Sequence, residues 1–254
     1  MSLILSLALL LGATLASPVA AGDAAALRVI GFSPDGTIFA FEQYTMLYED
    51  EAAFSEYFLI DTRTDRYLPG TPIKVLLRDD DGNDEKKARE QAAAKAAPLI
   101  AQHRIEQPGT RHEGKASMAL DEIGIYQMNT GPLAKAQAFT LPDGRKARLM
   151  VSQRSLGKAD CDGAGGRGVK GKVAVAGLKL TLTLDGKPMI LQEDKQLPPA
   201  RRCVSGYGIA EVYLHTALDG AITLAAMIET VDNHDYHAGP NRRFIAVTRR
   251  LAPK

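Results

Sequence analysis

Residues 31–44, "GFSPDGTIFAFEQY", join a turn signal to a strand pattern. Ser33-Pro34-Asp35-Gly36 has the composition of a tight turn, and the apolar and aromatic run that follows it favours a β-strand. The same Asp-Gly pair recurs between apolar runs at positions 143–144, 185–186 and 219–220. Asp-Gly between two apolar runs is a strong short-range signal for a hairpin. These pairs therefore predict antiparallel hairpins.

Strand-like runs dominate the rest of the chain as well. They cover Leu27–Phe32, Ile38–Thr45, Tyr57–Asp61, Ile123–Met128, Ala147–Gln153, Val173–Leu184, Ile209–Leu214, Ile222–Val231 and Phe244–Thr248. One helix is expected at about residues 83–97, "NDEKKAREQAAAKAA", which ends against Pro98. Because its apolar face is mostly alanine, it should cover a sheet thinly. We predict a mainly β fold, an antiparallel sandwich or partly open barrel with one edge helix.

The opening motif has one related copy near the C-terminus. Residues 34–63 and 218–250 both read as Asp-Gly, a long strand, a polar loop and a strand that ends near arginine. A β-propeller needs about four blades or more, and the middle of the chain contains no further copies. The pattern therefore predicts two related hairpins in one sandwich. Because exposed hairpins resemble one another, chance similarity remains an alternative.

The N-terminus has the features of a secretory signal peptide. An apolar run from Leu3 to about Ala13 precedes Val19-Ala20-Ala21, which fits a small-residue cleavage site before Gly22. The run is too short to span a bilayer of about 30 Å. We expect residues 1–21 to be the signal peptide and residues 22–254 to form a single β-rich domain, periplasmic or secreted. A buried N-terminal helix is the alternative.

Charge and cysteine content exclude some classes of function. The formal net charge is +1, which does not match the strong basic excess of a nucleic-acid-binding protein. No later segment approaches the ~18 apolar residues of a membrane helix. In an exported protein, Cys161 and Cys203 are expected to form a disulfide; two buried free thiols are the alternative. The bridge would close a loop of about 43 residues.

The residues around these motifs resemble a family of bacterial predicted secreted proteins whose domain has no assigned function. The resemblance is carried by Gly31–Tyr44, Ile60-Asp61, Gly70-Thr71-Pro72, Leu191–Asp194, Leu197-Pro198, Arg202-Cys203 and Arg242–Thr248. It implies export and one contiguous domain, and it carries over no catalytic residues. The segment after Tyr44 departs from the family, which has a glycine-rich stretch there. The Ser-Pro-Asp-Gly turn also resembles a TolB-type propeller repeat, over the first hairpin only.

The stretch "DNHDYH", residues 232–237, is the one candidate metal site. His234 and His237, flanked by Asp232 and Asp235, supply donors that zinc or copper accepts. His215 is a poor third ligand, because the strand Ile222–Val231 separates it from His234. Ten residues at about 3.3 Å each put the two histidines about 33 Å apart. A third ligand would come from Glu49, Asp50 or Glu51 in the first hairpin. The alternative is a solvated polar loop.

Signatures of catalysis are weak. There is no G-x-S-x-G motif, and no Ser or Cys stands beside a His and an acid in a recognisable pattern. Glu42 and Glu229 occupy similar places in the two hairpins and are candidates for a carboxylate pair. The alternative is that each faces solvent or pairs with Arg242 or Arg243.

These observations favour a non-enzymatic, exported protein that binds a small ligand or an envelope partner without a cofactor. The two long hairpin loops, residues 45–55 and 231–242, are the expected binding surface, because loops held by a rigid sheet commonly carry function. The candidate residues are Tyr48, Glu49, Asp50, Glu51, Asp232, His234, Asp235, Tyr236, His237 and Arg242. The rival hypothesis is a metal-assisted hydrolase that uses His234 and His237.

Overall fold

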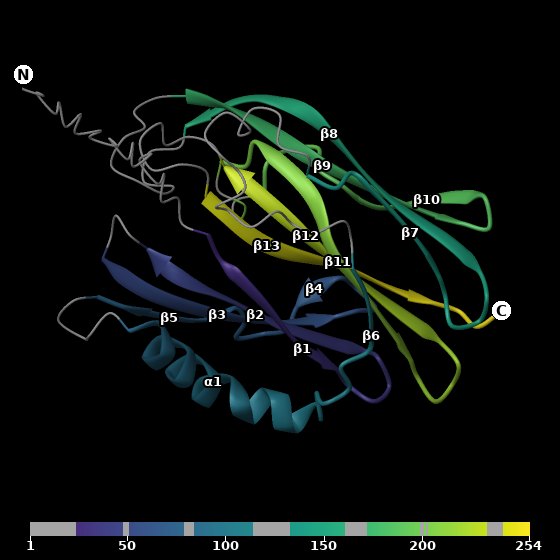
Figure 1. Ribbon diagram of the computed structural model, residues 1–254, viewed down its shortest axis with the longest axis horizontal. Coiled ribbons are helices and arrows are strands. Elements are labelled where there is room, and N and C mark those ends of the chain that lie inside the picture. Colours follow the sequence, from purple (N-terminus) through teal and green to yellow (C-terminus); the bar gives the residue numbers. More distant parts are fainter. Residues whose placement is uncertain are drawn as a thin grey trace, which may run out of the picture.

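In the described part of the chain, the fold is a stack of three antiparallel β-sheets with one helix on its outer side (Figure 1). The computed structural model describes residues 24–47, 51–78, 84–113, 133–160, 172–198, 201, 203–232 and 241–254. Neighbouring strands in all three sheets are antiparallel (β1 with β2, β8 with β9 and β12 with β13, for example). The predicted mainly β, antiparallel sandwich is therefore confirmed, and the described strands form no closed barrel.

The three sheets are named here by their place in the stack. The helix-side sheet contains β1 (Ala26–Phe32), β2 (Ile38–Leu47), β3 (Ala52–Asp61), β4 (Arg66–Tyr67) and β5 (Ile73–Leu77). The central sheet contains β6 (Thr110–Glu113), β11 (Gly206–Thr216), β12 (Ile222–Asp232) and β13 (Asn241–Leu251). The outer sheet contains β7 (Ala136–Thr140), β8 (Lys146–Asp160), β9 (Lys172–Leu184) and β10 (Lys187–Glu193).

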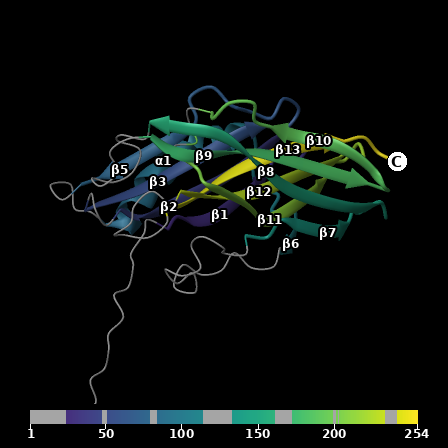
Figure 2. The ribbon, with the colours of Figure 1, turned by 90° about the horizontal axis from the view of Figure 1, so that it is seen from above.

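The central sheet is buried on both faces. Along β12, Ala225 and Met227 face the core shared with the helix-side sheet, whereas Leu224 and Ile228 face the core shared with the outer sheet. Because side chains alternate between the two faces of a strand, one apolar strand supplies both cores. Figure 2 shows the strands of the stacked sheets running roughly along one axis, which is the aligned mode of sheet packing.

All four Asp-Gly pairs connect neighbouring antiparallel strands, as predicted. They join β1 to β2, β7 to β8, β9 to β10 and β11 to β12. The glycines have positive φ, for example 67° at Gly36 and 78° at Gly220, a conformation that glycine adopts without strain. The short strands β4, β5, β6, β7 and β10 were not predicted, and the predicted strand 123–128 lies outside the described residues.

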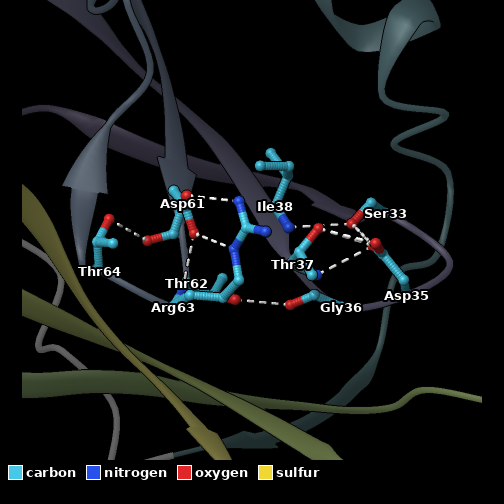
Figure 3. Close-up of polar contacts among 9 residues, drawn as sticks. All are labelled: Ser33, Asp35, Gly36, Thr37, Ile38, Asp61, Thr62, Arg63 and Thr64. Atoms are coloured by element: carbon cyan, nitrogen blue, oxygen red, sulfur yellow. Dashed lines mark hydrogen bonds and ion pairs between the residues drawn. The ribbon is translucent and has the colours of Figure 1, made fainter. Parts of the chain in front are cut away.

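The opening Ser-Pro-Asp-Gly turn is fixed by its own side chains (Figure 3). Ser33 Oγ donates to Asp35 Oδ1 at 2.6 Å and accepts from the N–H of Ile38 at 2.9 Å. Thr37 donates to Asp35 through both its backbone N–H and its hydroxyl group. Thr62, in the turn after β3, donates to the carbonyl of Gly36 at 2.7 Å. The turn is therefore joined to the far end of the β2–β3 hairpin.

The two related hairpins, β2–β3 and β12–β13, face each other across one core. Phe41 and Phe58 contribute to it from the first hairpin, and Met227 and Phe244 from the second. Thr223, in the second hairpin, donates to the same Gly36 carbonyl at 2.9 Å. The Asp-Gly turns of the two copies thus lie together, and Arg250 joins them by donating to the Asp35 carbonyl and to Asp219 Oδ2.

Helix α1 (Glu85–Gln102) covers the helix-side sheet over β3 and its edge strand β5. Asp84 caps it by accepting from the N–H of Lys86 at 2.8 Å, and its buried residues are alanines, as predicted. The helix continues through Pro98 to Gln102, five residues beyond the predicted end. An internal proline disfavours a helix by about 3 kcal/mol. Packing of Leu99 and Ile100 against the sheet offsets that penalty.

Candidate functional site

Most of the predicted binding residues lie outside the described part of the chain. These are Tyr48, Glu49 and Asp50 in the first hairpin loop, and His234, Asp235, Tyr236 and His237 in the second. The described candidates are Glu51, Asp232 and Arg242. Glu51 is exposed with φ of 46°, Asp232 accepts from Asn241 Nδ2 at 3.1 Å, and Arg242 Nε donates to the carbonyl of Ala25 at 3.3 Å.

The strand ends that carry both loops line a single cleft. Leu47 ends β2, Asp232 ends β12 and Asn241 begins β13, and all three contribute to its wall. The cleft has a volume of about 790 Å³. It runs along β13, which is an edge strand of the central sheet, between residues of the helix-side sheet and residues of β10 and the segment after it. Its position partly matches the surface predicted from the sequence.

The free edge of β13 is partly closed by hydrogen bonds from other elements. Gln43 Oε1 accepts from the N–H of Phe244 at 2.8 Å, and Asp65 Oδ1 accepts from the N–H of Thr248 at 2.7 Å. The N–H of Ala25 donates to the carbonyl of Arg242 at 3.0 Å. Backbone groups of alternate residues point to the same side of an antiparallel strand, so Ala246 also faces this edge. Within the described residues, nothing caps its backbone.

Most charged side chains on the cleft wall are engaged with other groups of the protein. Glu56 accepts from Gln43 Nε2 at 3.0 Å and pairs with Lys74 at 3.3 Å. Asp65 accepts from the backbone and hydroxyl of Thr248. Burial raises the pKa of the Asp65 carboxyl group, and these donors counteract the rise only in part.

The short strand β4 forms the rim of the cleft. Tyr67 is 42% exposed, although its ring stands 5.5 Å from that of Phe58 beneath it. Arg66 is exposed, and no described residue pairs with its guanidinium group. Arg201, on the opposite wall, is instead held by Asp194. The consecutive residues Arg66 and Tyr67 therefore give the cleft a guanidinium group without a described partner and an exposed aromatic ring.

Comparison with known proteins identifies the family of the chain. The family described as predicted secreted protein (DUF2259) matches residues 40–250. The chain belongs to this family. Neither the curated proteins nor the solved structures contain a significant match.

Membership in this secreted family agrees with the predicted export and with the resemblance seen in the sequence. The family description names no ligand and no reaction. No helix among the described residues is long and apolar enough to cross a membrane. Any assignment of function within this secreted family therefore has to come from the site itself.

The metal hypothesis gains no ligands from the described part of the chain, where no three His, Cys, Asp or Glu side chains gather as a metal site. His215 lies at the Asp-Gly turn end of the molecule, as predicted. Its Nε2 is 3.0 Å from the carbonyl oxygen of Pro34, and its ring stacks on Phe32. Residue 232, at the far end of β12, leads into the loop with His234 and His237.

Glu42 and Glu229 do not form a pair, and neither faces solvent. Glu42 is the fifth residue of β2 and points toward α1, where it binds Arg89. Glu229 is the eighth residue of β12 and points toward the helix-side sheet. Strand side chains alternate between the two faces of a sheet. The fifth and the eighth positions of two related strands therefore point to opposite faces. The alternative pairing with Arg242 or Arg243 was also wrong for Glu42.

Cys203 lies beside the end of the β8–β9 hairpin where β8 ends and β9 begins. It is 4% exposed and packs in a small apolar cluster with Val175, which Ala159 and Val173 also contact. Cys161 lies outside the described residues, but it directly follows Asp160, the last residue of β8. The predicted bridge to Cys161 therefore stays a prediction, and the surroundings of Cys203 are compatible with it.

Sequence patterns indicated little of the cleft wall. Arg66 and Tyr67 form a strand of two residues, which is too short for a periodic signal. Gln43 and Asp65 cap β13 from a strand and a turn that are distant in sequence, and their composition is ordinary. An aromatic residue next to arginine just before the Leu68-Pro69-Gly70 turn was the one available clue.

Proposed function

We propose that this protein is an exported, non-enzymatic binding protein that holds a small ligand in the cleft along β13. The signal peptide, residues 1–21, directs it to the periplasm or the exterior, and residues 22–254 act as one domain. The observation that supports binding best is the cleft itself. Its volume of about 790 Å³ lies in the range of about 300–1,000 Å³ that is usual for small-molecule sites.

The composition of the wall also supports a binding site. Ligand sites are mainly apolar with a few placed polar groups. Phe54, Phe58 and Phe244 line the cleft together with the exposed ring of Tyr67. The backbone of Ala246 and the guanidinium group of Arg66 are polar groups not engaged by the described part of the protein. The strands reach further into the predicted loops 45–55 and 231–242 than expected, and the strand ends Leu47, Asp232 and Asn241 line this wall.

A neutral fluorescent probe, N-phenyl-1-naphthylamine, tests whether the cleft binds small molecules. The mature protein should bind it saturably at one site. Tyr67→Ala should weaken binding several-fold, because it removes the exposed aromatic surface at the rim. Leu218→Ala is the matched control, since Leu218 is fully exposed but lies in the β11–β12 turn, away from the cleft. Absence of saturable binding, or equal loss in both variants, would contradict the proposal.

Export has its own test. Ala25 is fully buried and bonded to Arg242, so the chain just after the expected cleavage site is part of the fold. Mass spectrometry of exported protein should therefore find an N-terminus near Gly22 or Asp23. An intact Met1 on a cytoplasmic product would contradict export.

A further inference from the structure

We propose that the cleft along β13 selects a small amphiphilic anion, that is, an apolar body that carries a carboxylate or phosphate group. The inference rests on the proposed binding function and names its ligand class. The anionic group binds Arg66, and the apolar body lies against Tyr67 and the phenylalanines below it. Three features of the wall carry this assignment.

The first feature is the balance of charge on the cleft wall. Its cationic residues are Arg66, Lys74, Arg201 and Arg243, and its acidic residues are Glu56, Asp65 and Asp232. Each acid already accepts hydrogen bonds from protein groups, whereas Arg66 has no ion-pair or hydrogen-bond partner among the described residues. An anionic ligand group would gain a charge-assisted partner there. A cationic ligand group would meet only carboxylates that already accept hydrogen bonds from the protein.

The second feature is that the open donor on β13 lies in the same part of the cleft. Arg66 directly follows Asp65, which is bonded to the N–H of Thr248. Ala246 is two residues along the strand from Thr248, a separation of about 7 Å. The guanidinium group of Arg66 and the N–H of Ala246 are both donors. Phe58, whose ring contacts that of Tyr67, belongs to the apolar cluster against which Ala246 packs, and all of them line the cleft. Donors and apolar surface thus adjoin, as an amphiphile requires.

The third feature excludes an extended peptide as the occupant. A peptide strand that adds to an edge needs a row of free backbone groups. On β13 that row is interrupted on both sides of Ala246, because Gln43 caps Phe244 and Asp65 caps Thr248. Such caps protect an edge from strand pairing. The ligand therefore uses side chains and a single backbone position.

Three probes with the same apolar chain separate the chemistries: decanoate, decanamide and decyltrimethylammonium, each titrated calorimetrically into the mature protein below its aggregation concentration. We expect decanoate to bind at one site at least tenfold more tightly than the other two. Arg66→Ala should reduce its affinity about tenfold, to the level of decanamide, and leave decanamide binding unchanged. Arg63→Ala is the control, because Arg63 is exposed, bonded to Asp61 and not part of the cleft wall.

Raising the salt concentration gives a second measurement that needs no variant. Salt screens the contact with an exposed arginine, so decanoate affinity should fall while decanamide affinity does not. Equal binding of decanoate and decanamide, or tightest binding of the cation, would overturn the selection for an anion. If no decyl probe binds but the neutral naphthylamine does, the ligand class is wrong and the binding function stands. If the naphthylamine also fails, both are wrong.

Discussion

Arg89 of helix α1 holds the fully buried carboxylate of Glu42 with two hydrogen bonds. Nε donates to Oε1 at 2.9 Å and Nη2 donates to Oε2 at 3.2 Å. The ring of Tyr44 lies 3.6 Å from the same guanidinium carbon, and Ser55 Oγ donates to Oε1. The helix covers the sheet mainly with alanine, and this pair adds a polar connection between them.

Arg89→Ala should lower the free energy of unfolding by about 3 kcal/mol, because loss of one partner leaves a buried charge uncompensated. Arg28, whose Nη1 is 3.6 Å from Glu42 Oε2, keeps the loss at the lower end of the usual range. Urea denaturation measures the change. Lys86→Ala is the control, since its pair with Glu90 is exposed and should contribute less than 1 kcal/mol. Equal effects of the two variants would contradict this account.

Asp65→Ala should open the edge of β13. The N–H of Thr248 loses its acceptor, which should lower stability by about 1–2 kcal/mol, and the freed edge should promote self-association. Light scattering against protein concentration measures the second effect. Asp61→Ala is the control, because Asp61 belongs to the same turn and orders Arg63 (Figure 3) but does not touch β13. A monomeric Asp65→Ala protein would show that the edge is protected in another way.

Glu229 gives the fold a defined pH dependence. The residue is 2% exposed, and this burial raises its pKa, although the positive charges of Arg242 and Lys135 act in the opposite direction. Burial also disfavours the charged form of Lys135 and so lowers the pKa of that group. A carboxyl group with a raised folded-state pKa adds stability below its unfolded pKa of about 4.3, and this stability is lost as the pH rises through the folded pKa.

Melting temperatures across pH 4–8 should therefore fall less in Glu229→Gln than in the native protein as the pH rises. The glutamine variant should be the more stable of the two at neutral pH, because it removes a buried charge. Glu193→Gln serves as the control, since Glu193 is exposed and pairs with Lys179 at 3.4 Å. Parallel pH profiles for native protein and Glu229→Gln would show that Glu229 does not cause the dependence.

Local signals explain why the sequence predicted the fold class well. Each Asp-Gly turn depends on its own residues and the strands beside it, and all four were found. The order of the three sheets in the stack was not predictable in this way, because it depends on which sheet packs against each apolar face of the other sheets. Alternation along the strand puts Leu224 and Met227 on opposite faces, but both are apolar, and only packing decides which face meets which sheet.

The candidate site was less predictable than the fold for a related reason. Arg66, Gln43 and Ala246 come from three strands and acquire their roles only when β13 becomes an edge strand. The loop ends were predictable, because polar hairpin loops are visible in one sequence. Leu47 and Asp232 do border the cleft, so the sequence indicated the correct end of the molecule and missed most of the wall.

The proposed disulfide would hold the end of the long β8–β9 hairpin where β8 ends and β9 begins. Cys203 packs beside Ala159 and Val173, which are paired neighbours at that end, and Cys161 is two residues after Ala159. Unfolded, unreduced protein should resist alkylation at both cysteines.

Reduction, or Cys161→Ser, should lower the free energy of unfolding by roughly 3–4 kcal/mol, because a loop of about 43 residues is no longer closed in the unfolded chain. Ser205→Ala is the control, since Ser205 lies in the same segment and donates to Val231 but should keep the bridge and respond to reductant as the native protein does. Labelling of both cysteines before reduction would show that they are free thiols packed in the core.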